Sequence, residues 1–155
     1  MTKSLYNKLS AIANSQKFIF GQEFPLSFKL NGIRTNISTS DCKDVAGDHP
    51  GVYGIDPHYL LYKGADEKQI HINEAKHAYQ NGSVVTMEFH QLSRFDKKIY
   101  YSEITNPKDK SLMYDIVNDL NDSKAWYLAE LDQVLTIINS DLGFPVVFRP
   151  FVLFF

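Results

Sequence analysis

The sequence predicts an α/β protein built on a parallel sheet. Three observations support this prediction: short runs that are apolar on both faces, helical patterns that alternate with them, and a polar group at the end of each run. The length of 155 residues and the formal charge of −2 suit one compact domain, residues 1–155.

Four apolar runs predict the strands, and their polar ends predict a common rim. The runs are residues 17–22, 51–56, 83–90 and 144–151. Because they are apolar on both faces, we expect layers on both sides of the sheet. Groups able to bind or react end these runs, namely Gln22, Glu23, Asp56, Glu88, His90 and Arg149. Parallel α/β sheets place ligand sites at the carboxyl ends of their strands, so the six side chains predict one functional rim.

Helical patterns precede three of the runs. They cover residues 4–15, 66–80 and 123–140, and a short helix is expected at 111–120 after a long segment, 91–110. The first pattern is amphipathic, which is unlike the apolar core of a signal peptide. No stretch approaches the roughly 18 apolar residues of a membrane span.

Composition and motifs argue against several classes of function. Lysines and arginines are scattered, so neither nucleic acid nor a membrane surface is an expected partner. No glycine-rich phosphate motif follows a strand, and we expect no cofactor. His71 and His77 lie six residues apart on different faces of one helix and there is no cysteine pair, so no metal site is expected.

Five segments in order, FIFGQE, SDCKDVAGDHPGVYGID, VVTMEFH, WYLAELDQVL and PVVFRPF, resemble the successive landmarks of glycoside hydrolase family 26, the endo-β-1,4-mannanases. The second segment is the most specific, because family members carry SDVKDVTGDYPAVYGWD or a close variant there. The resemblance implies a (β/α)₈ TIM barrel, of which this chain would form the first half, strands one to four; a whole barrel takes about 250 residues.

The resemblance also implies that catalytic groups are missing. Family members continue Arg-Pro-Phe-His-Glu, and that glutamate is the general acid/base. This chain continues Arg149-Pro150-Phe151-Val152-Leu153, so Leu153 occupies the acid/base position. The nucleophile, a second glutamate, belongs at the end of strand seven, beyond the end of this chain. Because retaining glycosidases use two carboxyl groups, we expect the chain to be inactive alone and to be a fragment or a frameshift product.

Substrate-binding roles follow by resemblance. His90 would line the sugar cleft, and Arg149 would form hydrogen bonds around the carboxylates or a salt bridge with Asp56 or Glu88. Asp56 is expected to cap the following loop or to pair with Arg149. Tyr100 and Tyr101, in the long segment after strand three, are the stacking candidates.

Three hypotheses follow for the function. The first is the half barrel of a retaining mannanase, with β-mannan or manno-oligosaccharide as ligand and with self-association through its open sheet edges. The second is a non-catalytic mannan-oligosaccharide-binding protein closed by dimerisation. The third is an unrelated flavodoxin-like protein. The compartment is not fixed by the sequence, although family members are commonly exported.

Overall fold

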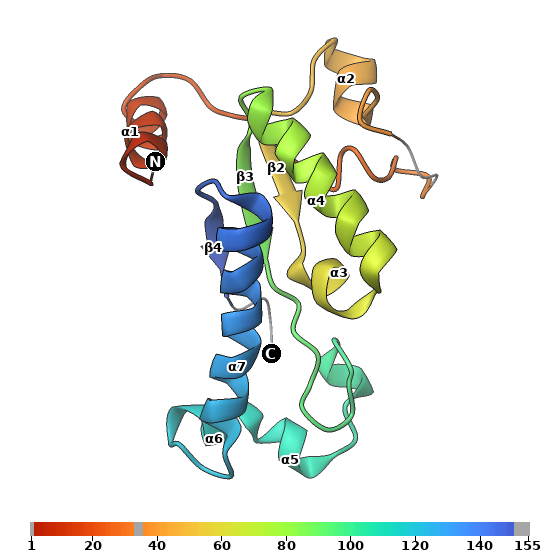
Figure 1. Ribbon diagram of the computed structural model, residues 1–155, viewed down its shortest axis with the longest axis vertical. Helices are drawn as coiled ribbons and strands as arrows, with labels where there is room; N and C mark the ends of the chain where they lie inside the picture. The colour runs from red at the N-terminus through yellow and green to blue at the C-terminus, as the bar shows by residue number, and fades with distance from the viewer. Residues whose placement is uncertain (1, 33–35, 151–155) are drawn as a thin grey trace.

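The computed structural model describes residues 2–32 and 36–150 and has one sheet of four parallel strands (Figure 1). The elements, in chain order, are α1 Thr2–Ala13, β1 Gly21–Glu23, α2 Asp41–Ala46, β2 Val52–Ile55, α3 Pro57–Tyr62, α4 Ala65–Gln80, β3 Val84–Glu88, a 3₁₀ turn η1 Tyr101–Glu103, α5 Pro107–Lys110, α6 Leu112–Val117, α7 Ser123–Thr136, a π-helical turn η2 Ile137–Leu142, and β4 Val147–Arg149. Strand order follows chain order, β1-β2-β3-β4, which confirms the predicted α/β class. None of the helices in the described ranges is long and apolar enough to cross a membrane.

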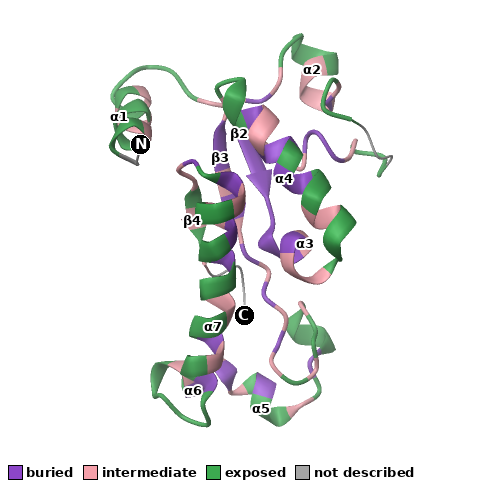
Figure 2. Cartoon of the chain, viewed as in Figure 1, coloured by how far each residue is buried: buried purple, intermediate pink, exposed green. Residues whose placement is uncertain are grey.

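The helix-facing side of the sheet holds the core. Tyr53, Ile55, Val85 and Met87 alternate along β2 and β3 and are almost fully buried. They pack with residues of α4, α7 and η2, among them Ile72, Ala75, Val134 and Ile137. Figure 2 shows this buried layer in purple on the two central strands and on the neighbouring side of α4.

The other side of the sheet is open, and here the prediction of two covering layers is wrong for the described residues. Glu23, Gly54, Thr86, Glu88 and Arg149 point to this side, because they fall between the buried residues in the period-two alternation. A shallow hollow of about 440 Å³ lies over them. We call this surface the inner face.

Gly54 has a steric role in joining the first two strands. It lies opposite Glu23 in the β1–β2 register, and a Cβ atom added at Gly54 would lie 3.2 Å from the Glu23 Cα. The Gly54 carbonyl also accepts a hydrogen bond of 2.9 Å from the Phe24 N–H. The glycine in the sequence VYGID therefore allows β1 to approach the sheet closely.

The first predicted strand begins later than expected. Residues 17–20 form no strand, and the side chains of Phe18 and Phe20 are largely exposed, although their apolar character predicted burial. The cause is the position of β1 at the sheet edge, where only β2 pairs with it. The fourth strand is also shorter than the predicted 144–151, and its last predicted residue, Phe151, lies outside the described residues, as does Leu153.

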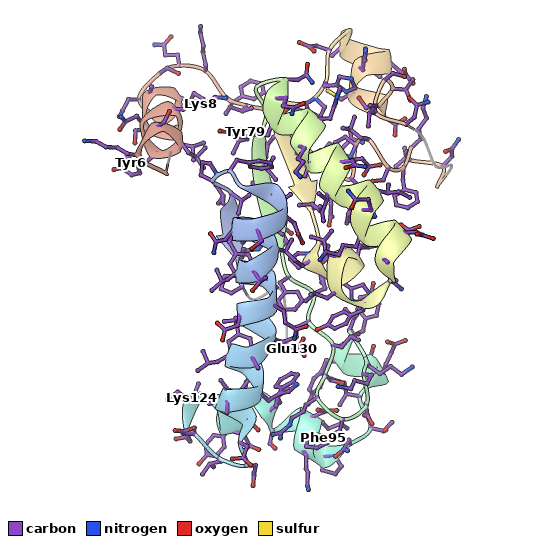
Figure 3. The ribbon with its side chains drawn as sticks, in the orientation of Figure 1. Tyr6, Lys8, Tyr79, Phe95, Lys124 and Glu130 are labelled. Atoms are coloured by element: carbon purple, nitrogen blue, oxygen red, sulfur yellow. The ribbon has the colours of Figure 1, made fainter. Side chains whose placement is uncertain are left out.

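Helix α1 lies to one side of the sheet (Figure 1). Its Lys8 ammonium donates a 2.6 Å hydrogen bond to the Gly82 carbonyl, in the turn that follows α4. Figure 3 shows Lys8 on the side of α1 near Tyr79, whereas Tyr6 points away and is exposed. A polar contact at the start of β3 therefore connects α1 to the rest of the domain.

Truncation of Ile55 tests the core directly. The side chain is fully buried between β2 and the helices, so Ile55→Ala leaves a cavity and should lower the free energy of unfolding by about 2–5 kcal/mol. Leu30→Ala is the control, because Leu30 is 98% exposed, and should change it by no more than about 0.5 kcal/mol. Urea unfolding followed by tryptophan fluorescence measures both. Equal effects of the two substitutions would contradict this assignment of the core.

Candidate functional site

The predicted rim residues lie at the carboxyl ends of the strands. Glu23, Glu88 and Arg149 are the last residues of β1, β3 and β4, and Glu88 lies opposite Arg149 in the sheet register. Asp56 and His90 follow β2 and β3 within two residues. Short apolar strands that end in charged residues therefore produce one cluster of charges at one end of the sheet.

Asp56 organises the middle of the rim. Its carboxylate is the N-cap of α3 and accepts a 2.8 Å hydrogen bond from the His58 N–H. The same carboxylate accepts the His90 N–H at 3.1 Å and contacts the His90 Nδ1 at 2.8 Å. The prediction that Asp56 caps the following segment is confirmed.

The contact with Asp56 fixes the orientation of the His90 ring. A carboxylate oxygen at 2.8 Å calls for a proton on Nδ1, which leaves Nε2 as the other polar atom of the ring. The His90 side chain is 29% exposed, whereas that of Asp56 is 7% exposed. The pair therefore presents an oriented imidazole to solvent over a buried carboxylate.

Arg149 pairs with Glu88 and not with Asp56. The Arg149 Nη2 lies 2.6 Å from the Glu88 Oε2 on the inner face. The predicted pairing of Asp56 with Arg149 is wrong, because His90 and the start of α3 occupy that carboxylate. The alternative partner, Glu88, was also expected from the sequence and is confirmed by this contact.

Glu23 is a further member of the cluster that was predicted for the rim but not for substrate binding. Partial desolvation raises the pKa of its carboxyl, and the negative charges of Glu88 and Asp56 raise this pKa further. His90 and Arg149 act in the opposite direction. All four of the other charged side chains of the rim therefore influence the pKa of Glu23. The signal available in the sequence was the position of Glu23 as the last residue of β1.

Tyr100 and Tyr101 lie at η1, in the long segment that follows β3. Their side chains are exposed, which leaves ring surface available for contact with a ligand. Within residues 2–32 and 36–150, no hydrogen bond or ring contact joins them to Asp56, His90 or Arg149. The structure therefore brings Asp56, His90 and Arg149 to one end of the sheet, and the two tyrosines form no direct contact with these three side chains.

The segment after β3 is held by two aspartates that the sequence did not single out. The buried Asp109 carboxylate accepts the backbone N–H groups of Phe95 and Asp96. The Asp96 carboxylate accepts those of Thr105 and Asn106, and these two hydrogen bonds lower its pKa. The segment is therefore an ordered loop whose conformation depends on carboxylates bonded to its own backbone.

The pKa of Glu23 provides a test of the rim geometry. Glu88→Gln removes a negative neighbour and should lower the pKa of Glu23, whereas Arg149→Gln removes a positive neighbour and should raise it. Lys124→Gln on α7 is the control and should leave it unchanged. Carbon-13 NMR titration of the carboxyl groups measures the three variants. Shifts of the same sign in Glu88→Gln and Arg149→Gln would refute the proximity of these charges.

Comparisons with known proteins agree with the fold described above. The family described as glycosyl hydrolase family 26 matches residues 1–152. A comparison with curated proteins found no match.

Three solved structures illustrate the likeness in fold. An endo-β-1,4-mannanase double mutant from Cellulomonas fimi matches with a TM-score of 0.75 and 23% identity, over 96% of this chain and 34% of that one. The catalytic domain of an endo-β-1,4-mannanase from Bacillus sp. JAMB-750 gives 0.75 and 20%, over 97% and 41%. A β-mannanase from Bacteroides ovatus gives 0.74 and 19%, over 96% and 44%.

The chain thus spans less than half the length of these structures. Its four parallel strands and their helices match the predicted half of a (β/α)₈ TIM barrel. The family match extends over nearly all of the sequence. This chain therefore belongs to glycosyl hydrolase family 26.

Proposed function

We propose that the chain supplies one half of the substrate cleft of a glycosidase that acts on β-1,4-linked mannan. The observation that carries this proposal is the rim itself: the Asp56–His90 pair and the Glu88–Arg149 pair lie together at the carboxyl ends of parallel strands. Sites of (β/α)₈ enzymes are built at this end of the barrel. Two solved structures of the same fold are named endo-β-1,4-mannanases, which supports mannan as the proposed substrate.

The rim offers the hydrogen-bonding groups that a sugar requires. Carboxylates accept hydrogen bonds from sugar hydroxyls, and the guanidinium of Arg149 donates to ring and hydroxyl oxygens. Asp56 fixes the ring of His90, so that the His90 Nε2 can bind a hydroxyl without a further loss of side-chain freedom. Tyr100 and Tyr101 are proposed to stack on sugar rings as exposed aromatic surfaces.

Hydrolysis by this chain alone is not part of the proposal. A retaining mechanism requires two carboxyl groups about 5–5.5 Å apart, one as nucleophile and one as acid/base. By resemblance the acid/base position holds Leu153, whose side chain carries no proton to transfer. We propose that residues 1–155 bind mannan and do not cleave it.

A second candidate function is non-catalytic binding by an assembly that closes the inner face. Both β1 and β4 are edge strands of the described sheet, so each has one side that no other strand pairs with. A groove of about 390 Å³ beside β4 is lined by Leu135, Ile138, Phe144 and Phe148, among others. Open edges and apolar grooves favour association, and two copies would together supply eight parallel strands.

Mannan binding is expected to depend on the rim. In affinity electrophoresis through soluble mannan, the unaltered chain should migrate more slowly than in a gel without mannan. Arg149→Ala and His90→Ala should each weaken binding by about 1–3 kcal/mol, which is about five- to 150-fold, since each removes hydrogen bonds to sugar. Lys124→Ala, on α7, should bind normally.

A reducing-sugar assay on the same samples separates binding from cleavage. We expect no release of reducing ends by residues 1–155. Cleavage that survives purification would contradict the proposed inactivity, and migration unaffected by mannan would contradict the proposed binding.

Self-association is tested by light scattering after size-exclusion chromatography. We expect the chain to elute as a dimer or larger species. Phe20→Lys beside β1 and Leu135→Lys beside β4 place charges at the two edges and should shift the chain toward monomer. Val45→Lys, on the exposed surface of α2, is the control. A sharp monomer peak with cooperative unfolding in the unaltered chain would rule out edge pairing.

A further inference from the structure

A buried histidine, His58, adjoins the rim without belonging to it. It is the second residue of α3 and is 5% exposed. The described residues offer no hydrogen-bond partner to its Nδ1, nor to the Nε2 of the buried Gln91, which follows His90. An unpaired polar atom in the interior costs free energy, and here two such atoms belong to residues that adjoin the Asp56–His90 pair. An apolar residue at position 58 would avoid this cost.

One route from His58 to His90 runs through the carboxylate of Asp56. The His58 N–H donates to the Asp56 Oδ1 at 2.8 Å, and the Asp56 Oδ2 contacts the His90 Nδ1 at 2.8 Å. Since His58 directly follows Pro57 in the first turn of α3, this part of the backbone has little freedom. The orientation of the carboxylate therefore depends on where the first turn of α3 is held.

A second route runs through a series of aromatic rings. The His58 ring contacts the Tyr62 ring edge-on, with centroids 5.2 Å apart, and also contacts the Tyr59 ring at 5.8 Å. Tyr62 in turn stacks on Phe89, with centroids 6.4 Å apart and planes inclined at 22°. Phe89 is buried and directly precedes His90. The His58 ring therefore helps to hold α3 against the segment that carries His90.

The charges around His58 favour a neutral ring. Partial burial lowers the pKa of His58, and the charges of Lys63 and His90 lower it further. The Asp56 carboxylate and a backbone hydrogen bond with His90 act in the opposite direction, and the net shift is downward. A proton added to the ring would place a charge in a buried layer where Nδ1 has no acceptor among the described residues.

We propose that His58 is a positioning residue of the rim, whose buried ring keeps the Asp56 carboxylate facing His90. This inference rests on the rim as the proposed sugar-binding site. His58 acts through Asp56 and Phe89 and does not touch sugar. Its effect at the surface is the tautomer of His90, with the proton on Nδ1 and with Nε2 left for a sugar hydroxyl.

Proton–nitrogen NMR spectra of residues 1–155, recorded without mannan slightly above neutral pH, test the proposal. They show which ring nitrogen of His90 carries the proton, and in the unaltered chain we expect Nδ1. His58→Ala removes the ring contacts and should raise the share of the Nε2–H form about fivefold, the effect of losing one hydrogen bond. His58→Phe keeps a ring in this place and should restore the Nδ1–H form.

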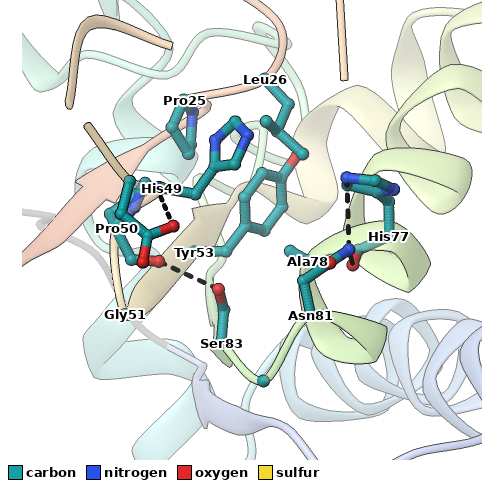
Figure 4. Close-up of a pocket in the computed structure, with 12 residues that line it drawn as sticks. Pro25, Leu26, His49, Pro50, Gly51, Tyr53, His77, Ala78, Asn81 and Ser83 are labelled. Carbon is teal, nitrogen blue, oxygen red and sulfur yellow. Dashed lines mark hydrogen bonds between the residues drawn. The ribbon is translucent and has the colours of Figure 1, made fainter. Parts of the chain in front are cut away.

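His77→Ala is the matched control and should leave the His90 tautomer unchanged. His77 lies in the last turn of α4 and lines a cavity with Asn81 at the opposite end of the sheet (Figure 4). Tyr62→Leu guards against misfolding of His58→Ala, because Tyr62 is only half-buried and its replacement breaks the ring series while His58 stays. It should shift the tautomer in the same direction. An unchanged tautomer in Tyr62→Leu, or in a folded His58→Ala, would overturn the proposal.

Urea unfolding at several pH values adds a readout that packing alone would not give. The unfolded chain takes up a proton at position 58 more readily than the folded chain does, so stability falls as the pH drops below the ordinary pKa of 6.5. His58→Phe lacks this group, so its urea midpoint should gain on that of the unaltered chain as the pH falls. A difference in midpoint that is independent of pH would contradict the neutral buried ring.

The two proposals fail in different ways. If mannan does not slow the unaltered chain but the His90 tautomer responds to His58→Ala, sugar binding is refuted and the positioning role stands. If mannan binds and the tautomer does not respond, the positioning role of His58 is refuted alone.

Discussion

The carboxylate of Asp56 is the constraint on which the rim depends. It is buried, and a buried charge is costly unless hydrogen bonds compensate it. The Asp56 oxygens receive the N–H groups of His58 and His90 and contact the His90 ring. One side chain thereby holds the end of β2, the start of α3 and the segment after β3 in a fixed relation, and the direction of the His90 ring follows from it.

The alternation of side chains along the strands explains why charged residues gather on the inner face. Helices cover one side of the sheet, so the residues that point toward them are apolar, as Ile55 and Met87 are. The intervening positions face away from the helices and tolerate polar groups, and Glu88 and Arg149 lie there opposite each other. A single pattern of period two therefore separates the core from the candidate site.

The spacing of apolar residues and the residues typical of caps and turns predicted the regular parts of the fold. The 66–80 pattern appears as α4 and the apolar run at 83–90 contains β3, because both are long enough to show their period. Helix α3 was missed, since six residues with an N-cap and a proline do not establish a period.

The exposed Phe18 shows that apolar character cannot identify an edge strand. The sequence left two carboxylates, Asp56 and Glu88, as possible partners of Arg149. The register of β3 and β4 places Glu88 opposite Arg149.

The charge balance of the rim bears on the kind of ligand it suits. Three carboxylates, Glu23, Asp56 and Glu88, lie near one permanent cation, Arg149. Partial burial raises the pKa of Glu23, and the negative charges of Glu88 and Asp56 raise it further. An anionic polysaccharide would meet repulsion from these groups. A neutral sugar avoids this repulsion and donates its hydroxyl protons to the carboxylate oxygens, which have more acceptor sites than Arg149 and His90 fill. This charge balance supports the proposal that the ligand is a neutral, hydroxyl-rich chain such as mannan.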